Sequence, residues 1–168
     1  MTDISTHTGG SPESPNLLSI SVQYFEAVKA KLERFGVPVI DLATRVWIGL
    51  VFFRSGQQKL DDWESTVFLF EYEYAVPVLS PTAAAYMATA FELAMPVLLF
   101  IGLASRLAAL PLLGMAMVIQ FILGAKNPAY NDFNHYAWVI FLLVIVVRGP
   151  GLLSVDHLVA RKFGSKDA

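Results

Sequence analysis

Three charged residues lie in or beside long apolar stretches of the sequence, where a charge is costly. Asp41 and Arg45 fall in IDLATRVWIGLVFF (residues 40–53), and Glu92 lies near the middle of the apolar stretch 82–103. Placing such a charge at the centre of a membrane helix costs about 2.5–3.5 kcal/mol. Because Asp41 and Arg45 are four residues apart, they share one face of a helix and can form an ion pair. Arg45 is also the cationic partner that we expect for Glu92.

Two interpretations of this cluster stay open. In the first, Arg45, Glu92 and Asp41, together with Gln120 and His135, border a cofactor-binding cavity for a polar head such as a quinone carbonyl, or a proton path. In the second, Arg45 and Glu92 are an interhelical ion pair that fixes the register of the helices and does no chemistry. The second interpretation leaves one acid over, since a single arginine requires only one carboxylate partner.

The sequence identifies no catalytic residue and no metal site. It contains no H-E-x-x-H motif, no glycine-rich phosphate loop and no assembled Ser/His/Asp set. His135 and His157 are separated by a predicted membrane span, so they cannot bind the same metal ion within one chain. The chain has no cysteine, so any thiol-based redox chemistry would belong to a partner.

The composition indicates an integral membrane protein. Of the 168 residues, 55% are hydrophobic and only 15% are charged, whereas soluble domains carry about 25% charged residues. The formal net charge of -2, without any basic run, gives no indication of a nucleic-acid partner. We expect one all-α domain, a membrane four-helix up-down bundle with an N-terminal amphipathic helix. The predicted spans are residues 37–56, 82–103, 106–124 and 135–147, the last extending back through Tyr130 or Phe133.

The segments outside the spans have distinct compositions. Residues 1–17 are rich in Ser, Thr, Gly and Pro and predict a disordered tail. Residues 18–36 predict an amphipathic helix at the membrane surface, with a helix packed on a soluble partner as the alternative. Residues 57–81 alternate acidic and aromatic side chains, which favours a short re-entrant or surface helix at the water-lipid interface. The four-helix domain is expected over residues 37–158, followed by a cytoplasmic tail at 159–168.

The distribution of basic residues predicts the orientation. With a cytoplasmic N-terminus, eight Lys and Arg residues fall on the cytoplasmic side and three on the other side. The positive-inside rule then places both termini in the cytoplasm. We therefore expect a multi-pass protein of a bacterial-type inner (cytoplasmic) membrane, in contact with membrane lipid.

Three motifs resemble the DoxX family of small four-helix membrane proteins. The first span reads R-x3-G-x2-F-x3-G-x2-K-L from Arg45 to Leu60, and the second reads E-x-A-x-P-x-L-L-x-I-G-L-x-S-R from Glu92 to Arg106. The third motif, GPGLLSVD at residues 149–156, is similar to the segment that follows the fourth helix in the family. The order and spacing of the motifs over residues 41–158 carry the resemblance.

The resemblance implies a role in membrane redox chemistry. The family is named after membrane subunits associated with thiosulfate:quinone oxidoreductase, so the implied function is a membrane subunit or accessory protein of a quinone-linked oxidoreductase. It implies quinone as the cofactor and a soluble or membrane oxidoreductase as partner, and it leaves open whether the chain is itself catalytic. The absence of cysteine departs from the thiosulfate-oxidising members. A non-enzymatic membrane scaffold or assembly partner and a small transporter are the alternative functions, and self-association into an oligomer stays open.

Overall fold

The computed structural model describes residues 17–74 and 79–163. Within these ranges the chain forms helices and short connections, without a β-strand. Apart from Leu17, the predicted disordered tail lies outside the described residues, as does the end of the predicted C-terminal tail beyond Phe163. The chain divides into two compact units, residues 1–36 and 37–168, which are described separately.

The described part of the first unit is a helix. Helix α1 spans Leu17–Lys31 and is followed by a π-helical turn, η1, at Leu32–Gly36. Its large apolar side chains, including Leu18, Val22 and Phe25, are exposed. The predicted helix over residues 18–36 is therefore confirmed, whereas its place at a membrane surface stays a prediction.

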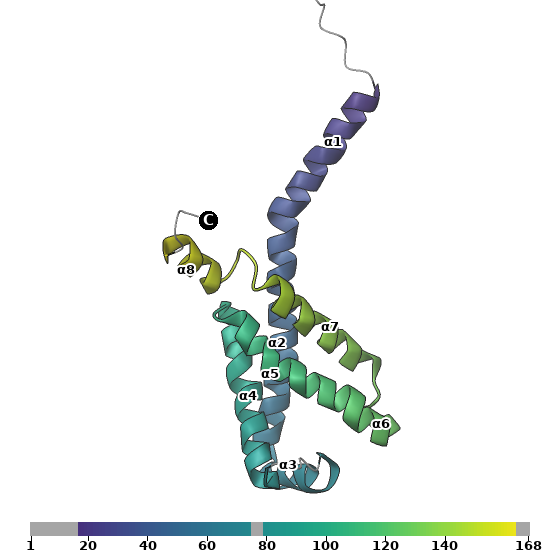
Figure 1. Cartoon of the computed structure of the whole chain (residues 1–168), viewed down its shortest axis with the longest axis vertical. Helices are drawn as coiled ribbons and strands as arrows, with labels where there is room; N and C mark the ends of the chain where they lie inside the picture. Colours follow the sequence, from purple (N-terminus) through teal and green to yellow (C-terminus); the bar gives the residue numbers. More distant parts are fainter. Residues whose placement is uncertain (1–16, 75–78, 164–168) are drawn as a thin grey trace, which may run out of the picture. The chain divides into compact units, whose positions relative to one another are not determined.

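The second unit contains the predicted spans. Four apolar helices form its body, and short helices connect or follow them (Figure 1). The order is α2 (Val37–Asp61), α3 (Trp63–Leu69), η2 (Phe70–Tyr74), α4 (Pro81–Ile101), α5 (Ser105–Met117), η3 (Val118–Leu123), α6 (Gly124–Lys126), η4 (Pro128–Tyr130), α7 (Phe133–Arg148) and α8 (Val155–Phe163).

The lengths of the helices agree with membrane spans. In the described part of the chain, three segments are long and apolar enough to cross a bilayer: Ile20–Asp61, Pro81–Ile101 and Ser105–Lys126. Helix α7 is apolar but shorter, and it begins at Phe133, within the extension that the sequence predicts. Two boundaries differ from prediction: α2 runs to Asp61 instead of ending at Gly56, and α8 occupies residues partly assigned to the tail.

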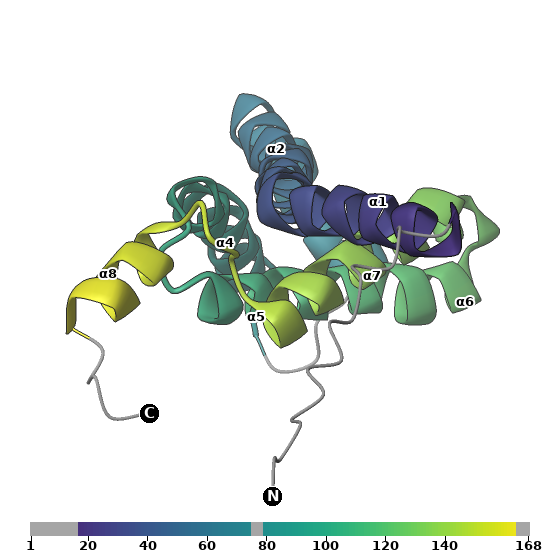
Figure 2. The same cartoon turned by 90° about the horizontal axis from the view of Figure 1, so that it is seen from above.

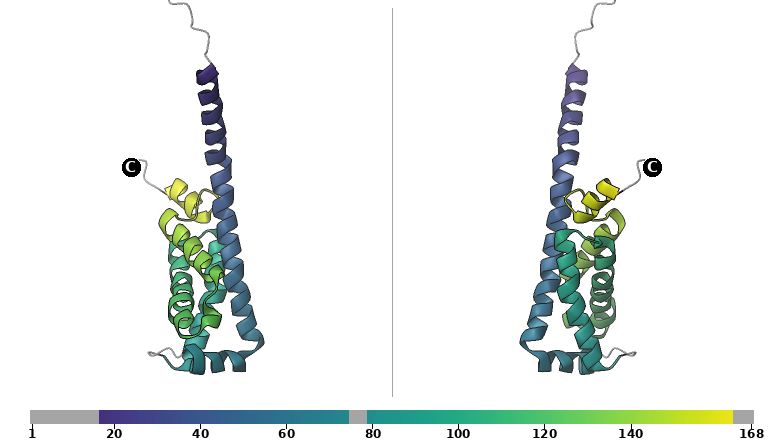
Figure 3. Two further views of the ribbon diagram at one scale, coloured as in Figure 1. Left: turned by 90° about the vertical axis from the view of Figure 1, so that its right-hand side faces the viewer. Right: turned by 90° about the vertical axis from the view of Figure 1, so that its left-hand side faces the viewer.

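The four long helices of the second unit pack in a closed ring. Helix α2 contacts α4, α4 contacts α5, α5 contacts α7, and α7 returns to α2. Seen from above, α5 and α7 lie together beside the α2 and α4 pair (Figure 2). Helix α3 lies across the ends of α2 and α4, at the opposite end of this unit from α8 (Figure 3). This arrangement confirms the predicted all-α up-down bundle.

The bundle has a tightly packed apolar centre and an apolar outer surface. Ile48, Leu99, Leu112 and Leu142 are fully buried at the centre. Alanines on α5 join this core, and small residues let membrane helices approach closely. Many large apolar side chains remain exposed on the long helices, including Leu107. A hydrocarbon environment accommodates such a surface, whereas water does not.

Asp132 caps the start of helix α7. The Asp132 carboxylate accepts a hydrogen bond of 3.0 Å from the backbone N–H of Asn134, at the start of α7. This N-cap satisfies one of the backbone donors that a helix leaves free at its first turn. The hydrogen bond from the Asn134 backbone lowers the pKa of the Asp132 carboxyl, and a second bond from the Asn134 side chain adds to this effect.

The turn between α4 and α5 depends on a glycine. Gly102 ends α4 with φ of 72°, a left-handed conformation that favours glycine. A Cβ atom at this position would also lie 2.5 Å from Cβ of Ser154 and 2.9 Å from its backbone Cα. The turn and the loop after α7 are therefore in close contact at Gly102.

We expect Gly102→Ala to lower stability, because it adds left-handed strain of about 1–3 kcal/mol and a clash with Ser154. The matched control is Gly114→Ala on α5, where a Cβ atom would have no neighbour within 4 Å. Alanine should leave stability unchanged or raise it there, since glycine is unfavourable inside a helix by about 0.5–1 kcal/mol. Thermal unfolding in detergent measures both variants; equal melting temperatures would contradict the assignment of Gly102.

Candidate functional site

Arg45 is bound by backbone carbonyl groups. Its side chain is 1% exposed. Nη1 donates a 3.0 Å hydrogen bond to the carbonyl of Leu99 in the last turn of α4, and Nη2 donates one of 2.5 Å to the carbonyl of Leu153 after α7. The Leu99 carbonyl also accepts a 3.2 Å hydrogen bond from the backbone N–H of Gly102, and the negative end of the helix dipole attracts a cation there. Arg45 therefore joins α2 to the end of α4 and to the loop that follows α7.

The expected pairing of Arg45 with acids is wrong. Among the described residues, the carboxylate of Asp41 pairs with Arg148, at 3.8 Å from its Nη2. Glu92 lies seven residues before Leu99 on α4, which is about 10 Å along a helix. Arg45 is level with Leu99, so Glu92 lies too far along the bundle to be its partner.

Lys59 is the partner of Glu92. The Nζ atom lies 2.7 Å from Oε2 and 3.0 Å from Oε1 of Glu92, and it donates a further hydrogen bond of 2.9 Å to Oγ of Ser55. The exposed fractions of the two charged side chains are 18% for Lys59 and 6% for Glu92. Such a pair is well compensated, because the ammonium group has three oxygen acceptors.

Sequence reasoning missed Lys59 because the first span was expected to end at Gly56. A signal for it existed in the sequence. Arg45, Gly49, Phe52, Gly56 and Lys59 follow one another at steps of four and three residues, which places them on one face of a helix. Four of the five are buried, and Lys59 is partly buried. The stripe indicates that the helix continues to Lys59 with the lysine facing the bundle.

The Lys59–Glu92 pair borders a cavity of about 550 Å³. Ser55 and His135 also line the cavity. Its wall further includes the aromatic residues Tyr74, Tyr130 and Trp138, and the rest of the wall is mostly apolar. Part of this wall comes from the π-helical segment η3 through Val118, Ile119 and Leu123. π-helical turns inside helices are frequent at functional sites.

His135 is held in a defined tautomer at this cavity. Its Nδ1 atom lies 2.9 Å from the carbonyl oxygen of Tyr130. Because a carbonyl oxygen can only accept, Nδ1 carries the proton, and Nε2 of the neutral ring is left as an acceptor. The ring also packs edge-on against Trp138, with centroids 4.5 Å apart. The cavity thus offers both a strong donor, Lys59, and hydrogen-bond acceptors.

The five residues predicted to form one site do not all line the same cavity. Glu92 and His135 line the cavity. Gln120 does not line it; its Nε2 donates a 2.6 Å hydrogen bond to Oδ1 of Asn131. Arg45 and Asp41 lie toward the end of the bundle near the loop after α7. A cofactor head could be held by Lys59, Glu92 and His135, whereas no cluster of three metal-ligating side chains occurs in the part of the chain that is described.

Comparisons with known proteins found one matching family and one similar protein. A family model described as DoxX matches residues 40–125, slightly more than half of the chain. A Haemophilus influenzae protein described as an uncharacterized protein is 26% identical over 144 residues, covering 81% of this chain and 93% of that protein. No solved structure matches the chain. The match includes Arg45, Lys59 and Glu92.

We expect Arg45→Met to destabilise the bundle strongly. The substitution keeps an unbranched apolar stem but leaves the carbonyls of Leu99 and Leu153 without their side-chain donor. Each lost hydrogen bond involves a charged donor and is worth about 1.5–3 kcal/mol. Thermal unfolding in detergent measures the loss, with Arg54→Met, at an exposed position of the same helix, as the control. Similar melting temperatures for the two variants would show that these bonds contribute little.

Proposed function

Because the chain belongs to the DoxX family of membrane proteins, we propose that it is a membrane subunit or accessory protein of a quinone-linked oxidoreductase. The observation that carries this proposal is the buried Lys59–Glu92 pair in the wall of a mainly apolar cavity. Pockets for small molecules are typically apolar, with a few convergent polar groups that fix orientation. The cavity has this composition.

The polar groups suit both redox forms of a quinone head. A quinone carbonyl accepts hydrogen bonds, and the Lys59 ammonium at the cavity wall could donate one to it in place of its bond to Oγ of Ser55. A quinol hydroxyl donates, and the Glu92 carboxylate and Nε2 of His135 can accept.

The size and lining of the cavity suit a ring with an apolar tail. Its volume of about 550 Å³ lies within the range of about 300–1,000 Å³ that is usual for ligand pockets. Phe91, Met115 and Ile119 supply apolar wall on two neighbouring helices. A bound quinone would supply two-electron redox chemistry, with electrons from the partner oxidoreductase.

The Lys59–Glu92 pair could hold or move a proton next to the head. The side chains of Lys59 and Glu92 are 18% and 6% exposed, and Ser55 extends the pair by one hydrogen bond. In the orientation that we propose, with both termini in the cytoplasm of a bacterial-type cell, the cavity lies in the outer half of the inner membrane. Proton exchange would then occur with the outward side.

We expect Glu92→Gln and Lys59→Met to weaken the binding of a quinone analogue at least tenfold. Loss of one hydrogen bond to a charged group costs about 1.5–3 kcal/mol, and about 1.4 kcal/mol corresponds to a factor of ten in Kd. The measurement is analogue titration of the purified protein in nanodiscs. Arg54→Gln, which lies on α2 outside the cavity lining, is the control.

The melting temperature of each variant shows whether it is folded. Equal affinities in the wild type, both cavity variants and the control would exclude the cavity as a quinone site. Gln120→Glu is a further control for the titration with the quinone analogue, because Gln120 is buried and does not line the cavity.

A further inference from the structure

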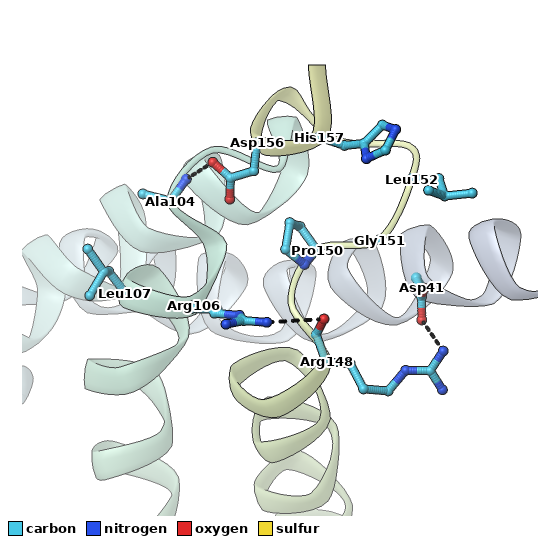
Figure 4. Close-up of a pocket in the computed structure, with 10 residues that line it drawn as sticks. All are labelled: Asp41, Ala104, Arg106, Leu107, Arg148, Pro150, Gly151, Leu152, Asp156 and His157. Carbon is cyan, nitrogen blue, oxygen red and sulfur yellow. Dashed lines mark hydrogen bonds and ion pairs between the residues drawn. The ribbon is translucent and has the colours of Figure 1, made fainter. Parts of the chain in front are cut away.

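The charges at the α8 end of the four-helix unit hold helix ends together. A cavity of about 540 Å³ lies there, and its two arginines are matched by two carboxylates (Figure 4). The Asp156 carboxylate accepts hydrogen bonds from the backbone N–H groups of Ala104 and Ser105, and Asp41 pairs with Arg148. Asp156 therefore caps the start of α5.

The cavity beside the Lys59–Glu92 pair has an apolar side instead. This side consists of residues of α4, α5 and η3. Helices α4 and α5 are joined by the turn at Gly102 and diverge away from it (Figure 1). As a result, α4 packs against α5 but hardly against η3, which continues α5. The cavity lies where the two helices separate.

Three residues form an open rim on this side of the cavity. Met87 on α4 is 47% exposed, and Val118 at the start of η3 is 43% exposed, although both line the cavity. Gly114, one helical turn before Val118, is also exposed, and a Cβ atom there would have no neighbour within 4 Å. We call Met87, Gly114 and Val118 the rim.

The rim lies at the depth of the hydrocarbon. Its residues fall inside two segments that are long and apolar enough to cross a membrane, Pro81–Ile101 and Ser105–Lys126. Gly114 is nine residues after Ser105, or about 14 Å along a helix, which is near the middle of a hydrocarbon core of about 30 Å. The rim therefore opens toward acyl chains.

The polar groups of the cavity lie away from the rim. A Cβ atom at Gly56 of α2 would lie 3.1 Å from Cβ of Glu92, so Glu92 faces α2. Met87 and Glu92 are five residues apart on α4 and point about 140° apart around the helix. A ligand whose head contacts the Lys59–Glu92 pair would therefore extend the rest of the molecule toward the rim.

Aromatic rings cover the cavity toward the α3 end of the unit. Tyr74 of η2 and Tyr130 of η4 both line the cavity, and their rings pack edge to face with centroids 6.3 Å apart. The segment η2 directly follows α3, which lies across the ends of α2 and α4. This end of the cavity is thus lined by packed rings, whereas the rim side is open.

We propose that the ligand enters this cavity sideways from the bilayer, between α4 and η3, and that its apolar tail lies against the rim. The inference rests on the proposed function and narrows its ligand class. The site takes a quinone that is dissolved in the membrane and carries a long apolar tail, rather than a water-soluble quinone.

Photolabelling of the full chain in nanodiscs tests the position of the tail. The probe is a quinone analogue with a decyl tail that carries a diazirine, and mass spectrometry locates the labelled residues. We expect labelling at Met87 and Val118 that falls at least tenfold in excess tail-less quinone. Labelling at Val97 and Leu107, which are exposed on α4 and α5 outside the cavity lining, should change less than twofold.

The competition separates the lateral route from the quinone site itself. If tail-less quinone competes for labelling that is concentrated at Tyr74 and Tyr130, the cavity binds quinone but the lateral route is wrong. If tail-less quinone competes for no labelling, the quinone site is wrong, and the lateral route fails with it.

A bulky side chain at the rim gives a second test. Val118→Trp should weaken binding of the decyl analogue at least tenfold and that of the tail-less analogue less than twofold, because the indole takes the space of the tail. Met117→Trp, at a neighbouring exposed position outside the lining, should leave both within twofold. Met87→Trp is a second rim variant, in case Val118→Trp does not fold. Unchanged binding of the decyl analogue in the rim variants would overturn the proposal.

Discussion

Every charge inside a bilayer needs a partner at its own depth, and the four-helix unit meets this requirement in two separate places. Nη1 and Nη2 of Arg45 donate to carbonyls at the end of α4 and after α7, whereas its buried Nε has no hydrogen-bond partner among the described residues. Glu92 is satisfied by Lys59, 14 residues further along α2 than Arg45, or about 21 Å. One stripe of side chains on α2 therefore carries both charge centres, one at Arg45 and one at Lys59. Gly49, Phe52 and Gly56 lie between them on the same stripe. The packing of α2 against α4 follows from this stripe.

The two centres differ in chemistry. Around Arg45 the guanidinium group bonds to the backbone, and the close contacts at Gly102 leave little free space, which is the arrangement of a structural joint. Around Lys59 and Glu92 the ion pair faces a cavity with aromatic and apolar walls. A buried ion pair gains little stability over apolar packing. This makes the second centre the better candidate for binding, and the first the better candidate for stability.

The fold could be predicted from the sequence because long apolar runs and their short connections determine a helical bundle. The pairing of the charges could not, because it depends on where each helix ends and at what depth neighbours meet. The predicted first span ends at Gly56 and leaves Lys59 in the interfacial segment 57–81, although its spacing from Arg45 follows the helical period. The partners of Arg45 are backbone carbonyls, which have no side-chain signature. His135 and Glu92 were both chosen as candidates, but only the fold brings them to the same cavity.

The most direct test of the central claim, that the cavity beside Lys59 and Glu92 is a ligand site, is the quinone content of the protein purified from membranes. Solvent extraction and mass spectrometry give the ratio of quinone to chain. We expect about one quinone per wild-type chain and a large loss in Gly114→Leu, because Gly114 lines the cavity and its Cβ position is open. The melting temperature should be unchanged. No quinone in the wild-type protein, or equal amounts in both proteins, would contradict the claim.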